Sequence, residues 1–126
     1  MVGEAMARIL FVDDDPHTLE TLSKSVSLFG HEALRASSGE QALALAAAEL
    51  PDLIITDIRL ADIDGLALTR QLQDTPGTMQ IPVVILSASP ELEVAEAAQQ
   101  AGAREFLSKH IRLNTLQEVI QRYASQ

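Results

Sequence analysis

The residues in this sequence best suited to chemistry are aspartates that follow short apolar runs. Asp57 comes directly after the run at residues 53–56, and an acidic cluster at residues 13–15 follows a similar run at residues 9–12. Carboxylates gathered at the carboxyl edge of a parallel sheet repel one another, and a hard divalent cation relieves that repulsion. The pattern therefore predicts a metal-assisted phosphate site.

A hydroxyl and an ammonium group follow two later apolar runs in the same way. Ser87 comes after residues 83–86, and Lys109 comes after residues 105–108. A lysine offers a point positive charge to a phosphoryl group, and a serine hydroxyl can donate a hydrogen bond to it without competing for the metal. We expect both side chains to reach the same site as the aspartates.

Each of these residues also has a purely structural interpretation. Three aspartates after a strand are most often a solvated turn that caps a helix, and Asp15 beside Pro16 fits that role. Asp57 or Lys109 alone could be a solvated residue. The functional interpretation depends on all of them arriving together at strand ends.

Length and composition limit the class of protein. A chain of 126 residues has the size of one domain. Eighteen acids against nine Lys and Arg give a formal charge of -9, which opposes direct binding to the negative backbone of nucleic acid. No stretch of ~18 apolar residues occurs, so we expect a cytoplasmic protein without a membrane span.

The lack of cysteine and the scattered positions of the histidines argue against other kinds of metal site. The chain has no cysteine, which excludes disulfides, thiolate catalysis and cysteine-based zinc sites. The histidines fall on different elements, so we expect them to be structural or solvated. They are His17, His31 and His110.

Short runs rich in Ile, Val and Leu predict strands buried on both faces, at residues 8–13, 53–57, 81–87 and 103–108. A weaker run at residues 31–36 is expected at the sheet edge. Strands that alternate with helices require right-handed crossovers and a parallel sheet covered on both faces. We predict the α/β class, with a doubly wound, flavodoxin-like (βα)5 fold and strand order 2-1-3-4-5.

Helices are predicted where apolar periodicity is bounded by capping and stop residues. The predicted helices run from Asp15 to Gly30; from Ser38, with Gln41 three residues on, to Leu50; over residues 65–74; from Ser89-Pro90 to Gly102; and onward from a cap at Asn114.

Five short motifs stand in register along the chain. They are Val-Asp-Asp-Asp-Pro at 12–16, Asp-Leu-Ile-Ile-Thr-Asp at 52–57, Asp-Ile-Asp-Gly at 62–65, Leu-Ser-Ala at 86–88 and Gly-Ala-Arg-Glu-Phe-Leu-Ser-Lys at 102–109. Together they resemble the receiver domain of bacterial response regulators, over about residues 7–123. The expected organisation is a single receiver domain at residues 1–126, with no output domain in this chain.

The resemblance implies a phosphorylation-dependent switch of a two-component system. Asp57 would accept a phosphoryl group from a histidine kinase, with Mg2+ as cofactor. The implied metal ligands are Asp13, Asp14, Asp57 and the backbone carbonyl of Arg59. A protein of this kind catalyses only its own phosphorylation and dephosphorylation.

The same resemblance assigns roles to three further residues. Ser87 and Lys109 would contact the phosphoryl group, and Ser87 would move inward on phosphorylation. Phe106 matches the aromatic that rotates inward in step with that move, although an aromatic beside a buried strand could also be plain core.

The implied partners are a sensor histidine kinase or phosphotransfer protein, and a downstream effector or output domain. The effector would read the face formed by the fourth helix, the fifth strand and the fifth helix. The resemblance also allows a phosphorylation-dependent dimer, without direct contact to nucleic acid or membrane.

The chain departs from the family at three places. Ser87 stands where the family more commonly has Thr, a change that keeps the hydroxyl. His110 stands where a proline usually follows the lysine, and a cis bond before a non-proline residue costs ~2.5 to 4 kcal/mol, so we expect a trans Lys109–His110 bond. Leu60-Ala61 replaces the usual Met-Pro, which should leave that loop more mobile.

Parts of the sequence are also compatible with two other functions. One is a receiver-shaped interaction module that never takes phosphate, which would be favoured if His110 displaced Lys109. The other is a phosphohydrolase of the haloacid dehalogenase type, suggested by the Asp-x-Asp pair of Asp13 and Asp15. His17 stands where that family has Thr or Val, and no length is left for a cap domain.

Overall fold

The computed structural model describes residues 6–88 and 92–124, and its strands and helices alternate along the chain. The strands form one parallel sheet in the order β2-β1-β3-β4-β5, which confirms the predicted fold and strand order. The strands are β1 (Arg8–Val12), β2 (Glu32–Ala36), β3 (Leu53–Asp57), β4 (Val83–Ser87) and β5 (Glu105–Ser108).

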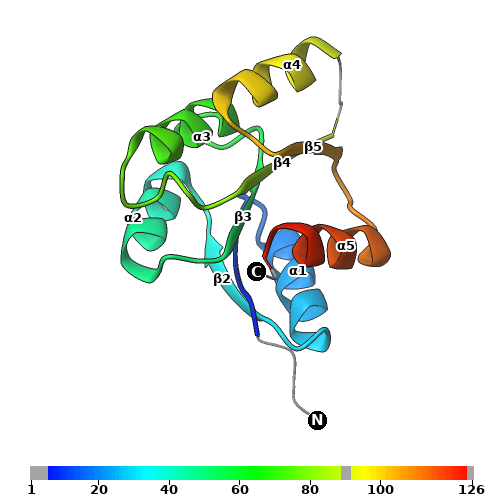
Figure 1. The fold of residues 1–126 in the computed structure, drawn as a ribbon. Helices are drawn as coiled ribbons and strands as arrows, with labels where there is room; N and C mark the ends of the chain where they lie inside the picture. The colour runs from blue at the N-terminus through cyan, green and yellow to red at the C-terminus, as the bar shows by residue number, and fades with distance from the viewer. Residues whose placement is uncertain (1–5, 89–91, 125–126) are drawn as a thin grey trace.

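The helices cover both faces of this sheet. Helices α1 and α5 lie side by side against one face, and α2, α3 and α4 cover the other (Figure 1). The helices are α1 (Pro16–Leu28), α2 (Gly39–Glu49), α3 (Gly65–Asp74), α4 (Leu92–Ala101) and α5 (Leu113–Tyr123).

Each face of the sheet has its own apolar core, because side chains along a strand point alternately to opposite faces. In β3, Leu53 and Ile55 pack with α1 and α5, whereas Ile54 packs with α2, α3 and α4. Every residue of β3 and β4 is buried, as predicted for central strands of a parallel sheet. Strand β2, at the edge, is more exposed.

Most predicted helix boundaries agree with the structure. Asp15 caps α1 and accepts a hydrogen bond from the His17 amide, and Ser38 caps α2 by accepting one from the Gln41 amide. The expected start of the fourth helix at Ser89-Pro90 lies outside the described residues.

The predicted cap of the fifth helix is wrong. Arg112 is the N-cap residue of α5, and it makes no side-chain capping hydrogen bond. Asn114 lies inside the first turn, where its Oδ1 accepts a hydrogen bond from the amide of the next residue, Thr115. The helix therefore begins earlier than predicted, at Leu113.

The strand register brings the carboxyl ends of the central strands together. Val12 pairs with Thr56 between β1 and β3, and Asp57 pairs with Leu86 between β3 and β4. Asp13, Asp57 and Ser87 therefore lie at the same edge of the sheet.

Among the described residues, no helix has the length and apolar character needed to cross a membrane.

The burial of side chains in the core predicts that alanine substitutions at two helical leucines have very different effects on stability. Leu68 of α3 is fully buried, whereas Leu28 at the end of α1 is 82% exposed. We expect Leu68→Ala to lower the free energy of unfolding by about 2–5 kcal/mol, because it leaves a cavity in the packed face. The control Leu28→Ala should stay within about 0.5 kcal/mol of wild type. Urea denaturation followed by circular dichroism measures both, and equal effects would contradict the assigned core.

Candidate functional site

Two buried aspartates occupy the carboxyl edge of the sheet. Asp57 is the last residue of β3, and Asp13 follows β1, with its backbone amide donating a hydrogen bond to the Ala36 carbonyl at 3.1 Å. Asp13 is 3% exposed and Asp57 is 8% exposed. Carboxylates this far from water need compensating charge or hydrogen bonds.

The aspartates form one cluster of acidic oxygens. One oxygen from each of Asp13, Asp14 and Asp57 lies within 4.8 Å of the other two. Asp14 is the exposed member, which leaves the cluster open to solvent on one side. The Asp13 Oδ1 also accepts a hydrogen bond from the Asp15 amide at 2.9 Å, which holds its carboxylate in place.

Lys109 bridges the two buried members of this cluster. Its Nζ lies 3.0 Å from the Oδ2 of Asp13 and 2.9 Å from the Oδ2 of Asp57. Burial alone would lower the pKa of Lys109, but hydrogen bonds to Asp57 and Asp13 raise that pKa above its ordinary value. When ionised, the three carboxylates and one ammonium group carry a formal charge of -2, which one divalent cation neutralises.

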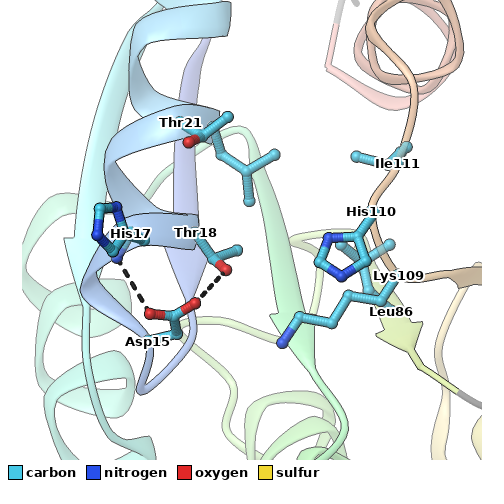
Figure 2. A pocket seen from close by; sticks show the side chains of 9 residues that line it. Asp15, His17, Thr18, Thr21, Leu86, Lys109, His110 and Ile111 are labelled. Carbon is cyan, nitrogen blue, oxygen red and sulfur yellow. Dashed lines mark hydrogen bonds between the residues drawn. The ribbon is translucent and has the colours of Figure 1, made fainter.

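The backbone of the loop after β5 sets the reach of Lys109. The Lys109 amide donates a hydrogen bond to the Ser87 carbonyl at 2.7 Å, so the loop continues beside β4. Figure 2 shows the Lys109 side chain extending from this loop toward the beginning of α1. No cis peptide bond occurs in the described residues, so the Lys109–His110 bond is trans, as expected.

His110 makes the turn that the loop requires. Its φ is 59°, in the left-handed region that residues other than glycine rarely adopt. His110, Lys109 and Ile111 line one wall of a pocket of about 320 Å³, and α1 forms the opposite wall with His17 and Thr18 among others (Figure 2). The pocket is a feature that the sequence did not indicate.

The remaining predicted residues surround the acids. Ser87 ends β4 and is buried, and Phe106 in β5 is half-buried beside Ile85. Phe106 packs against the core on the side of α2, α3 and α4. The Arg59 amide donates a hydrogen bond to the Asp57 Oδ1 at 3.4 Å, so the loop bearing the Arg59 carbonyl is adjacent to Asp57.

A second pocket of about 390 Å³ opens beside Ser87, toward α4. Arg59 and Ile58 contribute to its wall from the loop after β3, and Val94 contributes from α4. Ser87 therefore borders open space on the side of α4.

The histidines do not form a metal site in the described part of the chain. The Nδ1 of His31 accepts a hydrogen bond from the Ala7 amide at 3.0 Å, which is a structural role. His17 and His110 are exposed.

The contact between Asp62 and the start of α2 was not predicted from the sequence. The signal that could have indicated it is the set of backbone amides at the helix start, which need hydrogen-bond acceptors.

Comparisons with known proteins agree on one family. A family model described as the response regulator receiver domain matches residues 9–121. Protein PilH of Pseudomonas aeruginosa is 36% identical, over 91% of this chain and 95% of PilH. Response regulator PleD of Caulobacter vibrioides is 37% identical over 83% of this chain, but the matched part is only 23% of PleD.

Solved structures give the same result. A putative response regulator from Chloroflexus aurantiacus superimposes with a TM-score of 0.90 and 31% identity, covering 97% of this chain and 100% of that chain. The receiver domain of a sensor histidine kinase from Pseudomonas aeruginosa superimposes with a TM-score of 0.87 and 27% identity, covering 97% of this chain and 100% of that chain. That structure has a magnesium ion coordinated in its active site cleft.

The left-handed backbone at His110 predicts opposite effects of two substitutions. His110→Pro should destabilise the protein by more than about 1 kcal/mol, because the proline ring holds φ near −65°. His110→Gly should leave stability unchanged or raise it by up to about 1 kcal/mol, because glycine adopts positive φ without a steric penalty. Urea denaturation measures both.

His110→Ala is the control for this pair, since it removes the imidazole and retains the Cβ. We expect it to resemble wild type. A stabilised His110→Pro would show that the loop does not need the left-handed conformation.

Proposed function

Because this chain belongs to the response regulator receiver domain family, we propose that Asp57 is the residue on which its phosphorylation-dependent signalling depends. The observation that carries the proposal is the contact of Lys109 with Asp57 within the acidic cluster. The buried end of β3 presents one carboxylate, and an ammonium group and two other carboxylates surround it. This arrangement can accept a phosphoryl group and balance its charge.

The acids fit Mg2+ as a cofactor. Mg2+ prefers oxygen ligands, such as carboxylates and backbone carbonyls, and keeps some of its bound waters in proteins. Asp13, Asp14 and Asp57 would hold it, together with the carbonyl of Arg59. When bound, the ion neutralises charge on the transferring phosphoryl group.

The transfer itself requires a carboxylate oxygen of Asp57 to attack the phosphorus atom. A bond forms between that oxygen and phosphorus, and the bond from phosphorus to the histidine nitrogen of the donor breaks. The electron pair stays on the donor imidazole, which keeps or takes up a proton from water. The product is an acyl phosphate on Asp57.

Lys109 and Ser87 act on the phosphoryl oxygens in this scheme. The Lys109 ammonium, already 2.9 Å from Asp57, supplies positive charge where the phosphate charge develops. The Ser87 hydroxyl, at the end of the neighbouring strand, supplies a hydrogen bond. Movement of Ser87 toward the phosphate, followed by Phe106, would transmit the change to the surface. Because Phe106 has no hydroxyl, that movement depends on packing alone.

Partners follow from the same scheme. The donor is a sensor histidine kinase or a phosphotransfer protein, and the reader is an effector or output domain that contacts α4, β5 and α5. A phosphorylation-dependent dimer would be a further consequence of the modification. The cytoplasmic location, and the organisation as one receiver domain over residues 1–126, remain predictions.

The alternative of a module that never takes phosphate loses its motivation. It would be favoured if His110 displaced Lys109, and the distances of 3.0 and 2.9 Å from Lys109 to Asp13 and Asp57 argue against such a displacement. The phosphohydrolase alternative has no support from the family match, which covers residues 9–121.

Replacing the acceptor should abolish the modification. We expect Asp57→Asn to take up no phosphoryl group from a small acyl phosphate donor with Mg2+, because an amide oxygen is too weak a nucleophile. Intact-protein mass spectrometry measures the label. The matched control is Asp52→Asn, at the opposite end of β3, which should be labelled like wild type. Full labelling of Asp57→Asn would refute the assignment.

Mg2+ should stabilise the folded protein through the acidic cluster. A ligand that binds only the folded state stabilises it by about 1.4 kcal/mol at ten times its Kd, which corresponds to a rise of several degrees in Tm. We expect Asp14→Ala to lose most of this rise, because it removes one carboxylate ligand. Thermal unfolding with Mg2+, compared with Na+ at equal ionic strength, measures it. A wild-type Tm that ignored millimolar Mg2+ would count against the site.

A further inference from the structure

A carboxylate on the loop between β3 and α3 contacts the beginning of α2. The Oδ1 of Asp62 accepts a hydrogen bond from the Gly39 amide, and its Oδ2 accepts one from the Glu40 amide, both at 2.9 Å. The first amides of a helix have no acceptor within the helix. The Ser38 side chain accepts a hydrogen bond from the Gln41 amide. Asp62 accepts hydrogen bonds from the two preceding amides of the helix, which Ser38 does not reach.

The side chain next to Asp62 packs on the same point. A Cβ added at Gly39 would lie 2.5 Å from the Cγ1 of Ile63, closer than real Cβ contacts come. The loop therefore lies directly on the helix start, and the absence of a side chain at residue 39 permits this approach.

The other end of the loop is held against the phosphoacceptor. The Gly65 amide donates a hydrogen bond to the Ile58 carbonyl at 2.7 Å, and a Cβ at Gly65 would lie 2.6 Å from the Asp57 carbonyl oxygen. Arg59 lies between this fixed base and the contact at Asp62. The loop lacks the family's proline, and its higher mobility stays a prediction. These contacts attach it to the rest of the fold at both ends.

We propose that Asp62 is a positioning residue for the metal site, which fixes the Arg59 carbonyl by attaching its loop to the N-terminus of α2. This proposal rests on the proposed function, in which that carbonyl is a metal ligand. Asp62 supplies by hydrogen bonding the restraint that proline would supply covalently. A loop held in place before the ion arrives loses less conformational entropy on binding.

The electrostatics of the contact agree with this role. The pKa of the Asp62 carboxyl lies below its ordinary value because the Gly39 and Glu40 amides donate hydrogen bonds to its charged form. A negative charge is also favourable at the positive end of the helix dipole. The contact is thus present in the ionised state of Asp62.

The test compares Mg2+ affinity, by isothermal titration calorimetry well below the Tm, in three variants. Asp62→Ala should raise the Kd for Mg2+ about three- to tenfold and accelerate hydrogen exchange of the amides at residues 58–63. Asp62→Asn should fall between Ala and wild type, because its amide oxygen can accept one of the two hydrogen bonds. Asp52→Ala, which removes an exposed carboxylate bonded to the Arg8 amide at the opposite end of β3, should bind like wild type.

Each outcome has one meaning for the proposal. An unchanged Kd in Asp62→Ala would overturn the positioning role. A Kd raised equally in Asp62→Asn and Asp62→Ala, without faster hydrogen exchange, would also overturn it, because loss of the negative charge alone would explain that result. Failure of wild type to bind Mg2+ would instead overturn the proposed function. Gly39→Ala provides a second route: it retains Asp62, pushes on Ile63, and should also raise the Kd.

Discussion

Repulsion among carboxylates at one sheet edge is the constraint on which the rest of this structure depends. Asp13 and Asp57 are buried there, and Asp14 lies beside them, so the folded chain must bring positive charge to the same point. Lys109 does so, from a strand that is two positions away from β3 in the sheet. The loop after β5, which includes the left-handed His110, holds Lys109 where its ammonium group contacts both buried aspartates.

The sheet order explains why distant parts of the sequence serve one site. Strands β1 and β3 are neighbours in the sheet, although 40 residues lie between the end of β1 and the start of β3 in the sequence. The order 2-1-3-4-5 reverses direction beside β1, and ligands of open α/β sheets bind at such a point. Stability and the proposed function thus depend on the same strand register, because a slip of one residue in β3 would turn Asp57 toward the opposite face.

Much of this arrangement could be predicted from the sequence, because it depends on local patterns. Strand ends followed from short runs of Ile, Val and Leu, and the caps at Asp15 and Ser38 followed from residue type. Contacts between loops could not be predicted in this way. The hydrogen bonds of Asp62 join residues 22 and 23 positions apart, and the φ of His110 depends on the whole path of its loop. Asn114 shows the reverse failure, since a residue of capping type lies inside the helix whose first residue is Leu113.

The burial of Lys109 also gives the two lysines of the chain different accessibility to reagents. The sequence contains two lysines, Lys24 and Lys109. The Lys24 side chain is 73% exposed on α1, whereas that of Lys109 is 16% exposed and bound to carboxylates. Amine-selective reagents should therefore modify Lys24 before Lys109. A fluorophore or cross-linker could be attached on α1 without blocking the acidic cluster, in a chain that has no cysteine to label.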